Sequence, residues 1–346
     1  MSLSLRQKLG QLIIAGFHGK DAKDSWVQTF AEHLTKGEAG GLILFSYNVE
    51  SPEQLTNLTD FFHGLSTPHK LFISVDQEGG RVQRLKPDQG FPAAPSAATV
   101  AQGSLEDARG VYDAMARILT AHGINVDFAP CVDVNPEGPK CPVIGELQRS
   151  YSSLPAKVTD YGRAMIEAFR DRGLMSVIKH FPGHGSAQAD SHAGFVDVTA
   201  HWDERELIPF YALTKENGAD MVMTAHIFNE KFDAEMPATL SKPTLDHLRK
   251  NGYDGVIISD DLHMGAIQSH YDVSDATVKA LNAGCDMLIL SNNKAAAQGV
   301  EGFEPSPDLL PALLDDLERA VATGDLPEAR VDEAYGRVVA LKNKYL

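Results

Sequence analysis

Eight short apolar runs, spread along the whole chain, constrain most strongly how this sequence can fold. The runs are rich in Val, Ile, Leu or Phe, and most are bounded by Gly, Asp or Pro. Runs this short and this uniformly apolar are typical of strands that are buried on both faces, as in parallel sheets. They cover residues 12–17, 41–45, 71–75, 125–129, 175–178, 220–224, 255–258 and 286–290.

Helical patterns separate these runs, so strand and helix alternate along the chain. The clearest patterns cover residues 105–122, 155–172, 204–217 and 242–251. A glycine follows each of them, and we expect left-handed helix caps at these positions: Gly123, Gly173, Gly218 and Gly252. Residues 309–346 show two further amphipathic patterns, which predict a helical tail.

This alternation, without a Pro/Gly/Ser-rich linker, predicts an α/β fold: one (β/α)8 TIM barrel over residues 1–346, with the 309–346 tail packed on it. An open doubly wound sheet with a second domain is the alternative. Polar residues that end the runs favour the barrel, because there they would converge on one face: His18, Ser46, Asp76, Asp127, Lys179, His180, His226, Asp260, Ser291 and Asn292. No glycine-rich phosphate loop follows any run, so we expect no nucleotide cofactor.

Composition limits the compartment and the partners. The chain is 43% hydrophobic and 23% charged, as soluble globular proteins are, and its net charge of −16 disfavours nucleic-acid partners. Three cysteines without Cys-x-x-Cys spacing favour a reducing compartment. No apolar run is long enough for a membrane span, and residues 12–17 lack a signal-peptide cleavage site, so we expect a mature cytoplasmic protein without membrane partners.

The first of three polar motifs follows the third run. Residues 75–84 read VDQEGGRVQR and place a carboxylate and two arginines around paired glycines. The carboxylate of Asp76 can accept two hydrogen bonds from vicinal hydroxyls, and an arginine such as Arg84 can donate a fork to the same ligand. A plain Asp–Arg ion pair that braces the loop is the alternative, but the density of polar groups favours a ligand.

The second motif follows the fifth run and holds three histidines. Lys179 and His180 end the run, and glycines around His184 let the loop turn sharply. Asp190 and His192 stand two residues apart, so they share a face in an extended segment. A carboxylate bonded to one imidazole nitrogen fixes the tautomer and raises the pKa, which prepares the ring for acid/base chemistry near neutrality.

The third motif ends the seventh run with two consecutive aspartates. Alternation along a strand sends Asp260 and Asp261 in opposite directions, so we expect only one to face the barrel mouth. That carboxylate is a candidate nucleophile. The other is expected to cap a helix or to accept structural hydrogen bonds.

These motifs resemble the signatures of glycoside hydrolase family 3, and more closely its β-N-acetylglucosaminidase branch. The resemblance rests on VDQEGGRVQR at 75–84, KHFPGHG at 179–185, DSH at 190–192 and SDDLHM at 259–264, and runs from about residue 9 to at least 292. It implies a single (β/α)8 barrel, cytoplasmic in many bacteria. It also implies release of terminal GlcNAc from muropeptide fragments during cell-wall recycling, a small-carbohydrate substrate.

Residue roles follow from the same resemblance. It implies that Asp260 is the nucleophile and that His192, paired with Asp190, is the general acid/base. It further implies that five residues hold the sugar: Asp76, Arg84, Arg149, Lys179 and His180. Arg149 lies at a departure from the family pattern, because VIGELQRSY at 143–151 is two residues longer than the usual sequence.

These roles imply a retaining double displacement through a covalent glycosyl-Asp260 intermediate, with no cofactor and no metal. Because a neutral imidazole at His192 does not repel an anion as a carboxylate would, phosphate can compete with water; hydrolysis is favoured and phosphorolysis is the alternative. A barrel metallohydrolase that uses Lys179, His180, His226 and Asp260 belongs to a different class, but the first run lacks the expected His-x-His pair. A silent sugar-binding barrel would need neither Asp260 nor the Asp–His pair.

Overall fold

Eight parallel strands close into a barrel in sequence order, with β1 paired to both β2 and β8. The computed structural model describes residues 3–136, 141–190, 196–215 and 218–346. The closed barrel confirms the expected fold class, and the open-sheet alternative is wrong. The strands are β1 (Ile13–Gly16), β2 (Gly41–Leu44), β3 (Phe72–Val75), β4 (Val126–Asp127), β5 (Met175–Phe181), β6 (Met221–Thr224), β7 (Val256–Asp261) and β8 (Met287–Leu290).

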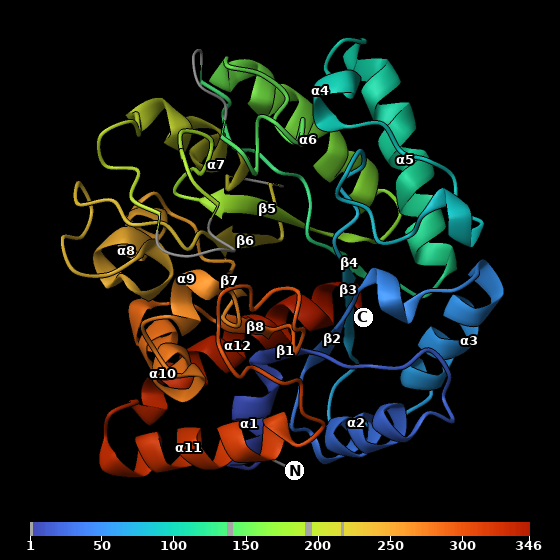
Figure 1. Cartoon of the computed structure of the whole chain (residues 1–346), viewed down its shortest axis with the longest axis vertical. Coiled ribbons are helices and arrows are strands. Elements are labelled where there is room, and N and C mark those ends of the chain that lie inside the picture. The colour runs from blue at the N-terminus through green and yellow to red at the C-terminus, as the bar shows by residue number, and fades with distance from the viewer. Residues whose placement is uncertain (1–2, 137–140, 191–195, 216–217) are drawn as a thin grey trace.

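Helices surround the strands in a ring, and the chain passes round this ring in order, as the colours in Figure 1 show. The α-helices are α1 (Leu5–Gln11), α2 (Ser25–Lys36), α3 (Pro52–His63), α4 (Ala97–Val100), α5 (Leu105–Ala121), α6 (Pro155–Arg170), α7 (Leu207–Leu213), α8 (Lys242–Lys250), α9 (Gly265–Gln268), α10 (Val273–Ala283), α11 (Leu309–Thr323) and α12 (Glu328–Tyr345). The 3-10 helices are η1 (Ser46–Asn48), η2 (Pro87–Gln89), η3 (Glu204–Glu206) and η4 (Ala238–Leu240).

The strands are apolar because both of their faces are covered. Nearly every strand residue is buried, and one continuous core joins the barrel interior to the inner faces of the helices. Phe17 and Phe62 illustrate this packing, with ring centroids 5.1 Å apart between the end of β1 and α3. Each fully buried side chain of this size stabilises the fold by roughly 1.5–3 kcal/mol, so the barrel is a rigid support for the side chains at its rim.

Two strands carry irregularities close to their C-terminal ends. The β5–β6 register shifts between Ile178 and Phe181, and the β7–β8 register shifts between Ile258 and Asp261. Such irregularities re-aim side chains and are common beside active sites. Lys179 and His180 lie within the first shift, and Asp260 lies within the second. These candidate site residues therefore lie where the regular alternation of side chains is interrupted.

Helix α12 contacts the opposite, N-terminal end of the barrel. The buried Lys342 ammonium donates hydrogen bonds to Gln11 at 2.9 Å and to the Gly40 carbonyl oxygen at 2.8 Å. Arg330 of α12 binds the fully buried Asp286, just before β8, at 2.8 Å. The C-terminal helix thus fixes the N-terminal ends of the strands and leaves the other rim of the barrel to the strand–helix loops.

Three local expectations need correction. Gly218 does not cap a helix, because α7 ends at Leu213 and its C-cap is Thr214, with a φ of −95°. A Cβ at Gly218 would approach the Leu213 carbonyl oxygen to 1.9 Å. The helix expected at 204–217 begins as η3, and α7 ends at Leu213; residues 216–217 lie outside the described residues. Strand β4 has only two residues, although backbone hydrogen bonds to β3 and β5 continue beyond it, from Phe128 to the Val75 carbonyl oxygen at 2.8 Å and from Val177 to the Ala129 carbonyl oxygen at 2.9 Å.

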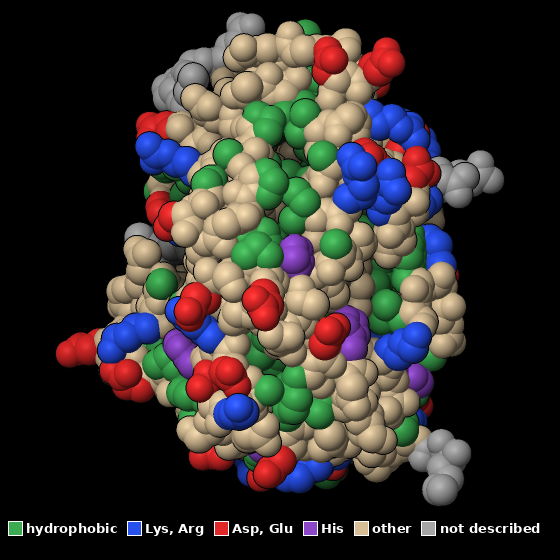
Figure 2. Space-filling model, turned by 90° about the vertical axis from the view of Figure 1, so that its right-hand side faces the viewer, with side chains coloured by type: hydrophobic (Ala, Val, Ile, Leu, Met, Phe, Trp, Pro, Cys, Tyr) green, Lys and Arg blue, Asp and Glu red, His purple; other side chains and the backbone are tan. Residues whose placement is uncertain are grey.

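Figure 2 shows the side of the molecule that α3, α4 and α5 form, where acidic and basic side chains are interspersed with hydrophobic ones. This mixed surface does not resemble the continuous basic face that binds nucleic acid. Within the described ranges, no helix combines the length and apolar character needed to cross a membrane.

Candidate active site

A cavity of about 340 Å³ opens at the C-terminal ends of the strands. Its polar wall is formed by Asp76, Arg84, Arg149, Lys179, His180, Asp190, Asp260 and Asp261. Apolar side chains complete it, among them Phe45, Val82, Met223, Met264 and Ile289. The cavity combines apolar packing surface with many convergent charged groups, and this rim is where (β/α)8 barrels perform catalysis.

The loop after β3 supplies one wall of the cavity. Asp76 receives a hydrogen bond from Arg84 Nη2 at 3.1 Å and another from Lys179 Nζ at 2.8 Å. The turn between Asp76 and Arg84 requires Gly79 and Gly80, whose φ angles are 96° and 63°. The Arg84 guanidinium also lies 5.8 Å from the Phe45 ring centroid. Its Nε is buried without a hydrogen-bond partner among the described residues, so it can donate to a ligand.

Glu78 is a member of the site that the sequence reasoning did not assign. It binds Arg149 through both carboxylate oxygens, at 2.8 and 2.7 Å, and Lys179 Nζ at 2.7 Å. Arg149 also donates to the Val143 carbonyl oxygen at 2.9 Å, so the longer 143–151 segment still delivers this guanidinium to the cavity. Only the position of Glu78 inside the 75–84 motif could have indicated its role.

The charges of this wall stabilise one another. Burial alone would raise the pKa of Asp76, but Lys179 and Arg84 outweigh burial and hold it well below its usual range. The pKa of Glu78 likewise falls to about 2, because Arg149 and Lys179 offset its burial. Burial would lower the pKa of Lys179, yet the two carboxylates raise it above its usual value. All these groups are therefore ionised at neutral pH and present fixed donors and acceptors to a ligand.

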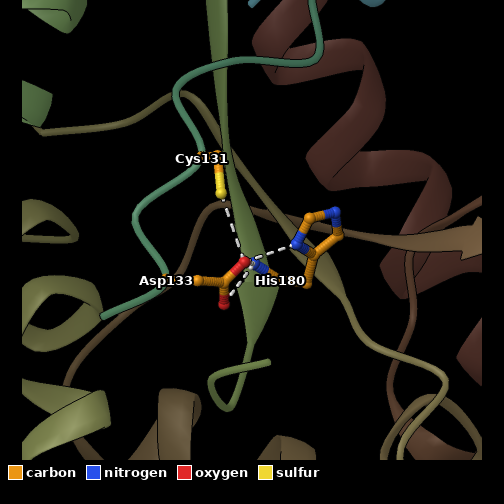
Figure 3. A group of neighbouring side chains, drawn as sticks. All are labelled: Cys131, Asp133 and His180. Atoms are coloured by element: carbon orange, nitrogen blue, oxygen red, sulfur yellow. Dashed lines mark hydrogen bonds and ion pairs between the residues drawn. The ribbon is translucent and has the colours of Figure 1, made fainter. Parts of the chain in front are cut away.

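His180 is held from both sides. Its Nδ1 lies 2.6 Å from Oδ2 of the fully buried Asp133, and its Nε2 lies 3.2 Å from Arg149 Nη2. Asp133 is a second residue that the sequence reasoning missed. Figure 3 shows its carboxylate between His180 and the thiol of Cys131, whose Sγ donates to Oδ2 at 3.3 Å.

The group of Cys131, Asp133 and His180 has the side-chain types of a metal site, because its potential ligand atoms lie within 4.8 Å of one another. However, the 2.6 Å contact between Nδ1 and Oδ2 is a short charge-assisted hydrogen bond. Burial, with the charge of Asp133, raises the pKa of the Cys131 thiol well above its usual value, and the thiol donates a hydrogen bond to the same carboxylate. The arrangement is better explained as a hydrogen-bonded support.

The two aspartates at the end of β7 have different environments. Asp260 is partly exposed in the cavity, and its Oδ1 accepts the backbone N–H of Asp261 at 2.8 Å. Asp261 Oδ1 accepts the backbone N–H groups of His263 and Ser291 at 3.1 and 2.9 Å. Contrary to expectation, both residues border the cavity, because the β7–β8 register shift interrupts the alternation. Burial raises the pKa of Asp261 to about 6.

Asp190 borders the same cavity and is partly buried. His192 lies outside the described residues, so its pairing with Asp190 stays a prediction. His184, the middle histidine of the second motif, is buried, and its backbone N–H donates to Asp133 at 2.7 Å. Burial lowers the pKa of His184 to about 4, so this ring is neutral and structural.

Two other strand-end residues do not border the cavity. Asp127 is fully buried, and its Oδ1 accepts the backbone N–H of Gln77 at 2.9 Å. His226 contacts Thr239 Oγ1 at 2.9 Å and the Asp261 carbonyl oxygen at 2.8 Å, so both ring nitrogens are engaged. Because Lys179 is also committed to Asp76 and Glu78, the ligand set of a barrel metallohydrolase is not assembled by these residues.

Replacing Lys179 by Met is expected to lower the free energy of unfolding by about 3–5 kcal/mol, because two buried carboxylates would lose their shared cation. Urea denaturation followed by circular dichroism measures this loss. The matched control is Lys20→Met, which removes an exposed ion pair with Glu50 and should cost less than about 1 kcal/mol. Equal losses in the two variants would contradict the proposed importance of the buried cluster.

Comparison with known proteins identifies relatives of this chain. A family description, "Glycosyl hydrolase family 3 N terminal domain", matches residues 4–341. Beta-hexosaminidase from Hydrogenovibrio crunogenus is 39% identical over 86% of this chain and 84% of its own length. Beta-hexosaminidase LpqI from Mycobacterium tuberculosis is 36% identical over 98% of this chain and 83% of its own.

Solved structures of family 3 enzymes are similar to this chain in sequence and in fold. A family 3 beta-N-acetylglucosaminidase from Paenibacillus sp. is 35% identical with a TM-score of 0.86, over 99% of this chain and 63% of that one. A family 3 glycosyl hydrolase from Mycobacterium smegmatis is 34% identical with a TM-score of 0.82, over 98% of this chain and 97% of that one. The chain also spans 61% of the length of Beta-hexosaminidase A from Pseudoalteromonas piscicida, with 32% identity.

Fold and cavity together define a (β/α)8 barrel with a charged pocket at the C-terminal ends of its strands. The sequence match over nearly the whole chain gives the family: the chain belongs to glycosyl hydrolase family 3.

Proposed function

We propose that this glycoside hydrolase is a retaining exo-β-N-acetylglucosaminidase that releases terminal GlcNAc. The observation that carries the proposal is the position of Asp260, a partly exposed carboxylate in a cavity whose wall is a network of fixed charges. The names of the relatives, beta-hexosaminidase and beta-N-acetylglucosaminidase, support the substrate class.

In this proposal the reaction proceeds by two displacements at the anomeric carbon. Asp260 attacks C1 while His192 donates a proton to the departing glycosidic oxygen, which leaves a covalent glycosyl ester on Asp260. His192 then takes a proton from water, whose oxygen attacks C1 and releases the carboxylate. Asp190 would orient His192 throughout. Two inversions retain the β configuration, and the acetamido group is recognised but does not act as the nucleophile.

The sugar would be held by the polar wall that other residues of the same cavity form. Asp76, Arg84, Arg149 and Lys179 are ionised and mutually braced, and the His180 ring contacts Arg149. These five side chains therefore offer directed hydrogen bonds without having to reorganise. Vicinal hydroxyls can donate to Asp76 and accept from Arg84. Sugar-ring carbons can pack on apolar side chains such as Met223 and Met264.

The physiological substrate in this proposal is a muropeptide fragment, and the compartment is the cytoplasm. The compartment is supported by the three cysteines, which are all free and buried. Fractionation of cells that express the tagged chain tests the compartment. Hydrolysis of anhydromuropeptides, compared with chitin oligosaccharides, tests the substrate.

Phosphorolysis is the second candidate. The observation that favours it is the set of three basic side chains around the cavity: Arg84, Arg149 and Lys179. Each is already paired with Asp76 or Glu78, which weakens the attraction for a free phosphate anion. Water therefore remains the favoured acceptor.

We expect turnover of 4-nitrophenyl N-acetyl-β-glucosaminide with β-GlcNAc as the first product. Proton NMR during the first minutes identifies the anomer, and the same assay with phosphate shows whether GlcNAc-1-phosphate forms. Preincubation with EDTA should leave the rate unchanged, since the mechanism needs no metal. A first product with the α configuration, or loss of activity with EDTA, would contradict the proposal.

A further inference from the structure

The buried Asp133 carboxylate binds the end of β5, where His180 lies, and the loop that follows this strand. Its oxygens accept hydrogen bonds from the backbone N–H of His180, at 3.2 Å, and from that of His184, at 2.7 Å. They also accept from the His180 ring and from Cys131 Sγ. Its pKa stays well below the usual range, because the hydrogen bonds that the His180 ring and the His184 backbone N–H donate to it offset the effect of burial. Asp133 is therefore a permanent acceptor directly behind the His180 ring.

The other ring nitrogen of His180 faces a group that can only donate. Arg149 Nη2 lies 3.2 Å from Nε2, and a guanidinium has no acceptor atom. Nε2 must therefore carry a lone pair, and the ring proton must reside on Nδ1, where Asp133 accepts it. The two partners together select one neutral tautomer.

Arg149 does not depend on His180 for its position. Two hydrogen bonds to Glu78 and one to the Val143 carbonyl oxygen already hold the guanidinium. The Nε2 lone pair can therefore be shared with a ligand without leaving Arg149 unpaired. A sugar hydroxyl that donates to Nε2 would keep its own oxygen free to accept from a neighbouring cation.

We infer that Asp133 is a positioning residue. It fixes His180 in the neutral Nδ1–H tautomer, so that Nε2 accepts a hydrogen bond from one sugar hydroxyl. The inference rests on the proposed function, because it gives His180 a specific task in sugar binding. It predicts poorer binding of an analogue in which that hydroxyl is methylated or replaced by fluorine.

The tautomer can be measured in the unmodified protein without substrate. Histidine-selective ¹⁵N labelling, with His180→Gln to assign the resonance, should show a protonated Nδ1 and an unprotonated Nε2 at neutral pH. A His180 ring with a proton on Nε2 would overturn the inference, whether or not the protein hydrolyses GlcNAc glycosides. A failure of the proposed function would instead appear only in the turnover assays.

Asp133→Asn is expected to lower kcat/KM by about 10- to 100-fold, mainly through KM, because an orienting partner of the imidazole is lost. When His180 is already replaced by Ala, Asp133→Asn should lower kcat/KM by less than about threefold, since Asp133 then has no ring to position. Asp332→Asn, at an exposed carboxylate of α12 remote from the cavity, is the matched control and should retain parental KM. An equal loss in both backgrounds would show that Asp133 acts only on the loop fold and would overturn the inference. If Asp133→Asn does not fold, the ¹⁵N measurement of the His180 tautomer in the unmodified protein tests the inference by itself.

Discussion

Asp260→Asn is expected to reduce kcat for aryl N-acetyl-β-glucosaminides by on the order of 10⁴-fold or more. The amide is a poor nucleophile, and loss of the nucleophile removes the covalent route that the remaining groups serve. Because the amide oxygen of the substituted side chain can still accept the backbone N–H of Asp261, the fold should be unaffected. Stopped and continuous assays of purified protein, with melting temperatures for both forms, measure the effect.

Asp261→Asn is the matched control. The carboxylate uses one oxygen, Oδ1, for the backbone N–H groups of His263 and Ser291, and an amide oxygen can accept both. We expect this variant to retain its rate within about tenfold. An activated 2-fluoro sugar should label Asp260 in the parental protein. Mass spectrometry that places the adduct on Asp261, together with an active Asp260→Asn variant, would reverse the assignment within this pair.

The order of elements could be predicted from the sequence because parallel strands buried on both faces leave an unmistakable apolar pattern. The directions of the side chains at the strand ends could not be predicted in this way. Ser259 and Asp260 interrupt the register between β7 and β8, so the simple alternation that separated Asp260 from Asp261 failed at the point where the chemistry lies. Such interruptions depend on neighbouring strands and leave no local signal.

The site could be predicted only where its residues belong to motifs. Asp76, Arg84, Lys179 and His180 lie in two conspicuous polar stretches, and the fold brings these together at one cavity. Asp133 lies in neither stretch, and its contact with His180 spans 47 residues of chain. A buried support of this kind becomes visible only when the loop after β4 and the end of β5 are seen side by side.

His192→Ala is expected to lower kcat/KM by about 10²–10⁴-fold for substrates with poor leaving groups, such as GlcNAc disaccharides. The loss should be much smaller for 2,4-dinitrophenyl glycosides, whose leaving oxygen needs no proton. The physical reason is that a general acid assists only the departure of a basic leaving group. Steady-state rates on a series of aryl glycosides, plotted against leaving-group pKa, should show a steeper dependence in the variant than in the parent.

Two further variants test whether the general acid/base role belongs specifically to His192. Asp190→Asn should show the same leaving-group trend with a smaller loss, because the imidazole remains but lacks its orienting carboxylate. His201→Ala, at an exposed histidine, should leave the rates unchanged. With activated substrates, azide should restore turnover in His192→Ala by attacking the glycosyl ester without general-base assistance, which yields the β-glycosyl azide. An equal loss across all leaving groups, with no azide product, would mean that His192 binds the sugar and does not transfer the proton.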